Sequence, residues 1–112
     1  MPDCLFCRIV KKEIPSRSVY EDDVLYAFHD IHPQAPTHIL LIPKRHIVGV
    51  AELEKEEEGL AGRLIYQARL IANSLKLKSY RLVFNSGAEA GQSVFHLHLH
   101  LLGGRRMSWP PG

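Results

Sequence analysis

The most informative segment of this 112-residue chain is Phe95-His96-Leu97-His98-Leu99-His100-Leu101. Histidines alternate strictly with apolar residues, which predicts a β-strand, because successive side chains on a strand point to opposite faces. The three imidazoles would then share one face at spacings of about 6.6 Å, while Phe95 and the leucines would face the core. Buried ring nitrogens need hydrogen-bond partners, so three aligned imidazoles pack poorly. We therefore favour a functional role for this row over a satisfied polar face or a site that only binds metal.

The chemistry that suits such a row is attack on phosphorus. Near neutral pH an imidazole is often uncharged, and its free ring nitrogen is a good nucleophile. A second imidazole can bind an anionic group, and phosphoryl transfer depends mainly on positioning and charge stabilisation. The preceding loop, Gly91-Gln92-Ser93, offers backbone N–H groups, an amide and a hydroxyl that can cradle a phosphate. Most glycine turns are only turns, but beside three histidines this one is a candidate phosphate loop.

The rest of the chain predicts an α+β domain. A long helix is expected over residues 52–77, because apolar residues form one stripe: Leu60, Leu64, Ile65, Ala68, Ile71, Ala72 and Leu75. A shorter helix is expected within residues 4–13, and it should end before Ile14-Pro15 because the residue before a proline disfavours the α region. Strands are expected at residues 18–21, 24–28, 39–42, 81–85 and 95–101. Mixed strands around one long helix indicate a largely antiparallel sheet.

The connecting segments are rich in turn residues. Asp22-Asp23 predicts a turn, residues 29–36 and 86–92 predict loops, and residues 103–112 predict an extended arm. The glutamates at 52–58 are interpreted as a solvated helix start, which the helix dipole favours, rather than as an acidic interaction patch. His29 and His32 receive no role and are expected to be surface or loop residues.

Composition narrows the class of protein. The formal net charge of +2, with 46% hydrophobic and 23% charged residues, is ordinary for a soluble globular protein. This charge is too small to indicate a nucleic-acid partner, and no apolar run approaches the roughly 18 residues that span a bilayer. The first residues show no secretory pattern, so the expected location is the cytoplasm and no membrane partner is expected. We expect one domain over residues 1–112, which a partner subunit would help to stabilise.

The cysteines, Cys4 and Cys7, have C-x-x-C spacing. In a reducing compartment this spacing indicates a metal or redox role rather than a structural disulfide. The alternative is a pair of reduced thiols, one or both of them buried.

The triad segment matches the histidine triad signature, in which three histidines alternate with apolar residues and two apolar residues follow. The chain resembles the Hint branch of the histidine triad (HIT) superfamily over essentially its whole length. The matching segments, in order, are Lys12-Glu13-Ile14-Pro15, Phe28-His29-Asp30-Ile31, residues 33–38, Pro43-Lys44-Arg45-His46, Asn85, His96 to Leu102, Gly103-Gly104-Arg105 and Trp109-Pro110-Pro111-Gly112.

The resemblance implies a fold, a reaction and an assembly. The fold is the HIT-like α+β fold, with a five-stranded, largely antiparallel sheet and one long helix in each subunit. Two subunits form a homodimer that shares a ten-stranded sheet. The reaction is hydrolysis of the P–N bond in purine nucleoside 5′-phosphoramidates such as AMP–lysine or AMP–amide, through a nucleotidyl-histidine intermediate.

The resemblance also implies roles for single residues. His98 would be the nucleophile, His100 would contact the phosphate, His38 would orient His98, and Ser93 would assist the leaving nitrogen. The nucleotide would be held further by Phe28, Asp30, Ile31, Asn85, Gly91, Gln92 and Trp109. Asp30 would bind the ribose hydroxyls, and Trp109 would reach the partner subunit's site.

Simpler interpretations stay open for four of these residues. Asp30 can be a turn residue or helix cap, and Ser93 can merely precede a strand. His38 can be an ordinary histidine at a strand end, and Trp109 can be packing material.

For the cysteines, the resemblance implies a structural zinc site. The four ligands would be Cys4, Cys7, His46 and His96, which leaves His98 free for chemistry. Two alternative functions remain: a dinucleoside polyphosphate hydrolase of the same superfamily, and a nucleotide-binding regulatory scaffold with little turnover. The Trp109-Pro110-Pro111-Gly112 ending favours the Hint branch, and the intact histidines argue against complete loss of activity.

Overall fold

The computed structural model describes residues 3–112. The helices are α1 (Leu5–Val10) and α2 (Glu58–Ser74), with three short 3₁₀ helices at Val50–Glu52, Lys55–Glu57 and Ala88–Ala90. The strands are β1 (Ser18–Glu21), β2 (Leu25–His29), β3 (Thr37–Pro43), β4 (Tyr80–Val83) and β5 (Leu99–Gly103). Met1 and Pro2, which open the segment without a secretory pattern, lie outside the described residues. Within residues 3–112, no helix is both long and apolar enough to cross a membrane.

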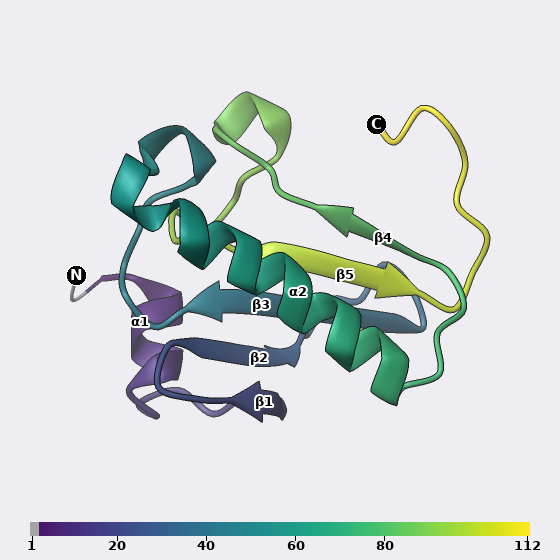
Figure 1. The fold of residues 1–112 in the computed structure, drawn as a ribbon, viewed down its shortest axis with the longest axis horizontal. Coiled ribbons are helices and arrows are strands. Elements are labelled where there is room, and N and C mark those ends of the chain that lie inside the picture. The colour runs from purple at the N-terminus through teal and green to yellow at the C-terminus, as the bar shows by residue number, and fades with distance from the viewer. Residues whose placement is uncertain (1–2) are drawn as a thin grey trace.

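The strands form one antiparallel sheet in the order β1-β2-β3-β5-β4. Helix α2 crosses one face of this sheet (Figure 1). This arrangement confirms the expected α+β fold with five antiparallel strands and one long helix. The triad segment leads into β5, which lies between β3 and β4 in the interior of the sheet.

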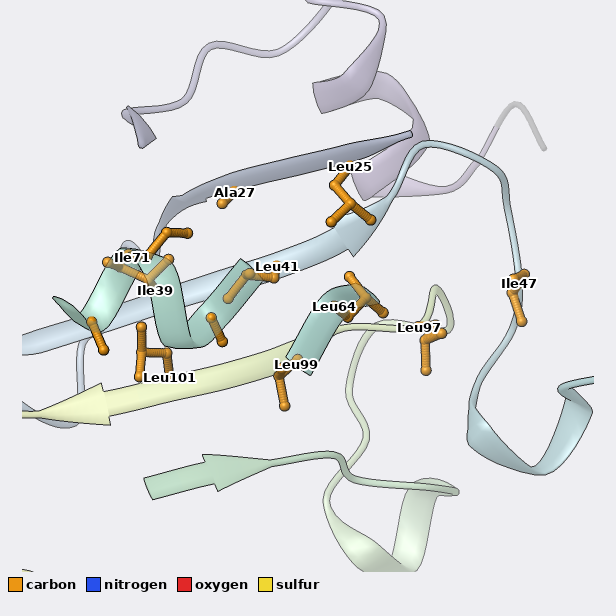
Figure 2. Packing of buried hydrophobic residues seen from close by; sticks show 12 residues of the cluster. Leu25, Ala27, Ile39, Leu41, Ile47, Leu64, Ile71, Leu97, Leu99 and Leu101 are labelled. Carbon is orange, nitrogen blue, oxygen red and sulfur yellow. The ribbon is translucent and has the colours of Figure 1, made fainter. Parts of the chain in front are cut away.

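The face beneath α2 holds the larger apolar core (Figure 2). Alternate residues of three strands point to it, including Leu25, Ile39, Leu41, Leu99 and Leu101, each almost fully buried. The helix contributes Leu64, Ala68, Ile71 and Ala72. Because each strand alternates its side chains, the intervening residues must point to the opposite face.

The opposite face holds a second, smaller core, and the histidines of the candidate site share that face. Its members come from α1 and from the other positions of β2 and β3: Phe6, Ile9, Tyr26, Phe28, Leu40 and Ile42. His38 and Leu40 point to the same face of β3, because they are two residues apart. His100 is paired with Leu40 on the neighbouring strand β5, so it points to that face as well. The larger apolar core therefore lies on one side of the sheet, and the candidate site histidines lie beside the smaller core and α1 on the other.

The long helix is shorter than the sequence predicts. Residues 50–57 form two 3₁₀ turns instead, and α2 begins only at Glu58. The backbone N–H of Glu54 donates to Oε1 of Glu57 at 2.8 Å, which completes a capping box and favours a helix start just beyond it. At the other end Lys76 has a φ of 60°, a left-handed conformation that stops the helix. Within the predicted stripe, Ile65 and Leu75 are exposed rather than buried.

The triad strand is also shorter than predicted. Regular pairing begins at Leu99, and Phe95 is 48% exposed instead of facing the core. The backbone ahead of Leu99 bonds outside the sheet, because Leu97 N–H donates to the carbonyl of Ile47 at 2.6 Å. Leu97, Leu99 and Leu101 are nevertheless buried, as the alternation predicts. The other strands lie within two residues of their predicted bounds.

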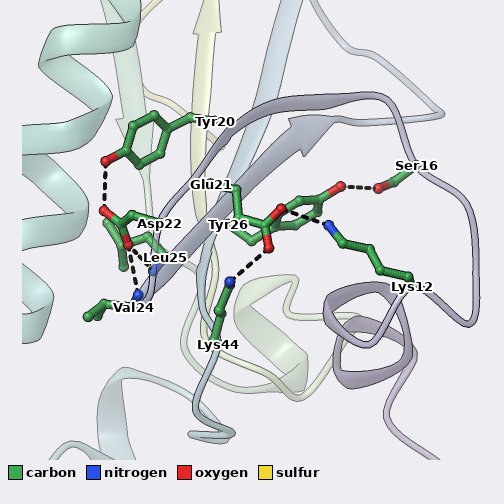
Figure 3. A network of polar contacts seen from close by, with 9 residues as sticks. All are labelled: Lys12, Ser16, Tyr20, Glu21, Asp22, Val24, Leu25, Tyr26 and Lys44. Carbon is green, nitrogen blue, oxygen red and sulfur yellow. Dashed lines mark hydrogen bonds and ion pairs between the residues drawn. The ribbon is translucent and has the colours of Figure 1, made fainter.

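Polar contacts fasten the first hairpin and the loop before it (Figure 3). Asp22 accepts hydrogen bonds from the Val24 and Leu25 N–H groups at 2.8 Å each and pairs with Arg63 of α2. The hydrogen bond from the Tyr20 hydroxyl to Asp22 holds the pKa of that carboxyl well below its usual range. The predicted turn at Asp22-Asp23 is therefore confirmed, and its first aspartate is the anchor.

Candidate active site and metal cluster

A cavity of about 350 Å³ lies on the face of the sheet that α1 covers. Histidines, two serines and an aspartate meet apolar side chains around it. The lining residues that bear on function are Phe6, Ile14, Ser16, Phe28, Asp30, Ile31, Ser93, His98 and His100. A concave, mainly apolar pocket with few polar groups is the usual form of a small-molecule site.

His98 is held so that one ring nitrogen has a free lone pair. Its Nδ1 lies 2.7 Å from the carbonyl oxygen of His96, and a carbonyl only accepts hydrogen bonds, so Nδ1 carries the proton. The neutral ring then has its lone pair on Nε2. Burial lowers the pKa of His98, which favours this neutral form. The ring of Phe6 packs edge-on against it at 5.1 Å.

His100 is oriented by a chain of hydrogen bonds that begins at the backbone. Gln34 N–H donates to Nδ1 of His38 at 3.0 Å, so the proton of neutral His38 is on Nε2. That Nε2–H donates to Nδ1 of His100 at 2.9 Å, which leaves the His100 proton on its own Nε2. Burial lowers the pKa of His38, and it lowers that of His100 to about 4. The rings of His98 and His100, 4.9 Å apart, therefore offer one lone pair and one N–H donor.

Asp30 combines a turn role with a place at the cavity. Its Oδ1 accepts a hydrogen bond from His32 N–H at 2.8 Å, as in the simpler interpretation of this residue. Its Oδ2 lies 3.4 Å from Nε2 of His38, and the residue lines the cavity with Phe28 and Ile31. The side chain of Ile31 is 83% exposed, so it stands at the rim.

Other predicted nucleotide contacts lie outside this lining. Gln92 is buried, and its amide is fully engaged: Oε1 accepts from Gly87 N–H at 2.9 Å, while Nε2 donates to the carbonyls of Val48 and Val94. Asn85 lies against Gly91, where a Cβ would be 3.6 Å from its Nδ2. Trp109 is 84% exposed on the arm. These positions bring no side chain to the cavity within this subunit.

Four residues near the cavity form a separate cluster: Cys4, Cys7, His46 and His96, with ligand atoms all within 4.8 Å of one another. Nδ1 of His96 lies 3.4 Å from Sγ of Cys4, 3.6 Å from Sγ of Cys7 and 3.3 Å from Nδ1 of His46. A tetrahedral zinc ion separates its sulfur and nitrogen ligands by about 3.5 Å and two nitrogens by about 3.3 Å. The donor set and its spacing therefore fit zinc.

His96 is prepared as a ligand by its second ring nitrogen. Nε2 donates to the carbonyl of Pro43 at 2.8 Å, so the lone pair of the neutral ring is on Nδ1, which faces the cysteines. Burial lowers the pKa of His96 to about 4 and keeps the ring neutral. Thus the three triad histidines divide between two environments: His96 in the Cys/His cluster, and His98 and His100 at the cavity.

Asp30, His38 and His100 also place ligand atoms within 4.8 Å of one another. Here the hydrogen-bond donors argue against a metal. Because Gln34 N–H occupies Nδ1 of His38, the proton of that ring lies on Nε2, the atom that would have to bind the ion. This group is a hydrogen-bond chain.

The comparison with known proteins decides the family. The model of the HIT domain family matches residues 11–107. The chain belongs to the HIT family. Among its relatives, an uncharacterised HIT-like protein of Synechocystis is 50% identical and aligns over 98% of this chain and 97% of its own. A 14 kDa zinc-binding protein of Zea mays is 51% identical over 96% of this chain and 87% of its own.

Solved HIT structures share the fold described above. A HIT family hydrolase from Legionella pneumophila is 48% identical, with a TM-score of 0.94 over 98% of this chain and 100% of its own. A HIT family hydrolase from Clostridium thermocellum is 44% identical, with a TM-score of 0.93 over 96% of each chain. The chain therefore has the fold of HIT family hydrolases.

Sequence reasoning missed several residues of this HIT site, among them His29 and His32, which line the cavity although no role was expected for them. Phe6 packs edge-on against His98 and against Phe28 at 5.5 Å, and it could have been found from the apolar pair Phe6 and Ile9, which are one helical turn apart. Residues 14–16 line the cavity after the helix stops, and no local pattern marks them. They reach it only because the chain between α1 and β1 folds back over the sheet.

Proposed function

We propose that this protein is a hydrolase of the Hint branch that cleaves the P–N bond of purine nucleoside 5′-phosphoramidates, with His98 as its nucleophile. The observation that carries the proposal is the hydrogen bond from Nδ1 of His98 to the His96 carbonyl, 2.7 Å long, at a ring that lines the cavity. It leaves the Nε2 lone pair available for attack on phosphorus.

In the first step, the lone pair on Nε2 of His98 forms a bond to the α-phosphorus. The bond from phosphorus to the substrate nitrogen breaks, and its electron pair leaves with the amine, which takes up a proton. Ser93, which lines the cavity, would assist this departure. The His98 ring gains positive charge as the bond forms, and the His96 carbonyl on Nδ1 stabilises that charge.

In the second step, water attacks the same phosphorus and gives up a proton to solvent, which balances the proton that the amine took up. The bond to Nε2 breaks, the electron pair returns to His98, and the nucleoside monophosphate is released. Two successive displacements by one imidazole replace a single difficult attack by water. The ring ends the cycle in its starting state because the proton on Nδ1 never leaves.

The surrounding residues would position the nucleotide. The Nε2–H of His100 would donate to a phosphate oxygen, and His38 would hold His100 in that orientation through the 2.9 Å hydrogen bond. Asp30 would accept from the ribose hydroxyls, and Phe28 and Ile31 would enclose the base. Asn85 and the backbone of Gly91 and Gln92 would border the phosphate and leaving-group side.

We also propose a homodimer with a shared ten-stranded sheet. Ile65, Tyr66 and Leu70 expose apolar surface on α2, and β4 is an open edge of the sheet. Apolar patches and open edges are surfaces that a partner subunit covers. Trp109, exposed on the arm, would then reach the site of the second copy.

The metal site would be structural. Cys4, Cys7, His46 and His96 would hold zinc, as the spacing of their donor atoms supports, and some plant relatives are named zinc-binding proteins. A bound zinc ion would cross-link the start of α1 to the segments that carry His46 and His96. It would take no part in the reaction, because His98 and His100 lie outside the cluster.

A turnover panel of AMP–amide, AMP–lysine, a GMP analogue and a diadenosine polyphosphate tests the function. We expect the phosphoramidates to be the preferred substrates, and His98→Asn to lose activity by about 1,000-fold or more while it still binds AMP. Preference for the dinucleotide would favour the alternative hydrolase. AMP binding with negligible turnover of every substrate would favour the regulatory scaffold. A His98→Asn variant with near wild-type turnover would exclude His98 as the nucleophile.

A further inference from the structure

A pair of hydroxyl groups lies on the β1 and β2 side of the sheet, away from β5, the strand that carries His100. Ser16 Oγ and the hydroxyl oxygen of Tyr26 lie 2.6 Å apart (Figure 3), and Ser16 lines the cavity. None of the roles assigned above uses either residue. Neither one is part of the histidine triad or of the Cys/His cluster.

The sheet fixes the distance between His100 and β2, the strand that carries Phe28 and Tyr26. Leu40 on β3 is paired with His100 on β5 on one side and with Phe28 on β2 on the other, so these three residues form a row across the sheet. Adjacent strands lie about 4.8 Å apart, which separates His100 from Phe28 by about 10 Å. Tyr26 stacks on Phe28 at 5.6 Å, and Ser16 precedes β1, the strand beyond β2. A nucleotide with its phosphate at the histidines would lay its base on Phe28 and point the far edge of the base toward Ser16.

The direction of the hydrogen bond between the two hydroxyls follows from burial. Tyr26 is only 2% exposed, so its O–H needs an acceptor, and Ser16 Oγ lies at hydrogen-bond distance from it. The Lys12 ammonium beside Tyr26 has no lone pair and cannot accept this proton. Tyr26 therefore donates to Ser16. The Ser16 proton is then uncommitted and available to the cavity.

The loop that carries Ser16 is held in place by charged contacts. The Lys12 ammonium lies 4.3 Å from the centre of the Tyr26 ring and donates to Glu21 at 2.8 Å. Lys44 holds the other oxygen of Glu21 at 2.7 Å. These contacts tie the start of the segment that carries Ser16 to β1 and to the Tyr26 ring, which helps to position the Ser16 donor.

From this geometry we infer that Ser16 is a base-reading residue: its hydroxyl donates a hydrogen bond to an acceptor on the distal edge of a purine, which in adenine is N1. The inference rests on the proposed function, because it assumes a nucleotide in this cavity. A pyrimidine ring is shorter than a purine, so its far edge would lie farther from Ser16, and we expect the contact to favour purines.

Equilibrium binding of AMP and 1-deaza-AMP to the full chain tests this inference. We expect Ser16→Ala to weaken AMP binding about 3- to 10-fold, the value of one neutral hydrogen bond. Wild type should bind 1-deaza-AMP more weakly than AMP by the same factor, and Ser16→Ala should no longer distinguish the two ligands. Ser16→Thr keeps the hydroxyl and should restore discrimination, while CMP binding should not respond to Ser16→Ala. In turnover, the loss should appear in KM with kcat within about twofold, as for a contact remote from the reacting atoms.

Three outcomes would overturn the inference. Unchanged AMP binding by Ser16→Ala would show that Ser16 makes no contact with the base. Equal weakening of AMP and 1-deaza-AMP would show that Ser16 only supports the loop. Failure of the wild-type chain to bind any nucleotide would remove the proposed function as well, which separates that failure from the other two.

Discussion

Replacing Gln92 by leucine tests whether its side chain stabilises the fold by holding three backbone segments together. Its amide makes three hydrogen bonds to the backbone, at 2.9 Å to Gly87, 2.7 Å to Val48 and 3.2 Å to Val94. Each neutral hydrogen bond is worth about 1 kcal/mol net, and leucine has nearly the same volume. We therefore expect Gln92→Leu to lower the free energy of unfolding by about 2 to 3 kcal/mol. In a domain of this size, that corresponds to a fall in Tm of about 10 to 15 °C.

Urea denaturation followed by circular dichroism measures this change, with Gln34→Leu as the matched control. Gln34 is exposed, and its side chain makes a single hydrogen bond, to the carbonyl of His32 at 3.1 Å. The control should stay within about 0.5 kcal/mol of wild type, as is usual for surface substitutions. A Gln92→Leu variant equal in stability to wild type would refute the structural role of the Gln92 side chain. Weakened AMP binding without loss of stability would instead indicate that the amide serves the ligand directly.

Three further predictions concern the hydrogen-bond chain, its titration and the metal cluster. His38→Phe removes the hydrogen bond to His100, and we expect kcat for AMP–amide to fall about 10- to 100-fold while AMP binding changes less than threefold. The pKa of His100 falls from 6.5 to about 4 on folding, so the unfolded chain binds more protons between these values. The free energy of unfolding, measured by urea denaturation, should therefore decline as the pH drops from about 6.5 to 4. The variant His100→Phe should show a smaller decline. Purified protein should contain about one zinc per chain by elemental analysis, and Cys4→Ser should lower both this content and the Tm.

Each of these predictions has a result that contradicts it. Normal kcat in His38→Phe would remove His38 as the support of His100. A pH dependence identical in wild type and His100→Phe would mean that His100 is not the group responsible. Less than about 0.2 zinc per chain would count against a tight four-ligand site.

Alternation and turn chemistry were enough to predict most of the fold. The buried leucines at 97, 99 and 101 follow directly from period-two patterning, and the strand at residues 18–21 has the bounds that were predicted. The start of α2 could not be predicted from these patterns, because Glu54 and Glu57 form a capping box. In a run of glutamates, the sequence does not distinguish such a box from the helix interior. The start of β5 depends on a hydrogen bond from Leu97 to Ile47, fifty positions away in sequence, which no local pattern contains.

The candidate site was predictable where its chemistry lies in the triad, and not where it depends on packing. The spacing of the triad indicated clustered imidazoles, but the division between His96 and His98 arises from their separate carbonyl partners, Pro43 and His96 itself. No local pattern indicates that the Gln92 amide bonds to the backbone instead of facing the cavity. Ser16 reaches the cavity only through the tertiary path of the loop before β1.

The central claim, attack by Nε2 of His98 on phosphorus, is tested most directly by the stereochemical course of hydrolysis. The substrate is a P-chiral adenosine 5′-phosphoramidothioate hydrolysed in ¹⁸O-labelled water. Two displacements, one by His98 and one by water, predict net retention of configuration at phosphorus. Net inversion would mean that water attacks directly, and it would contradict the covalent role of His98.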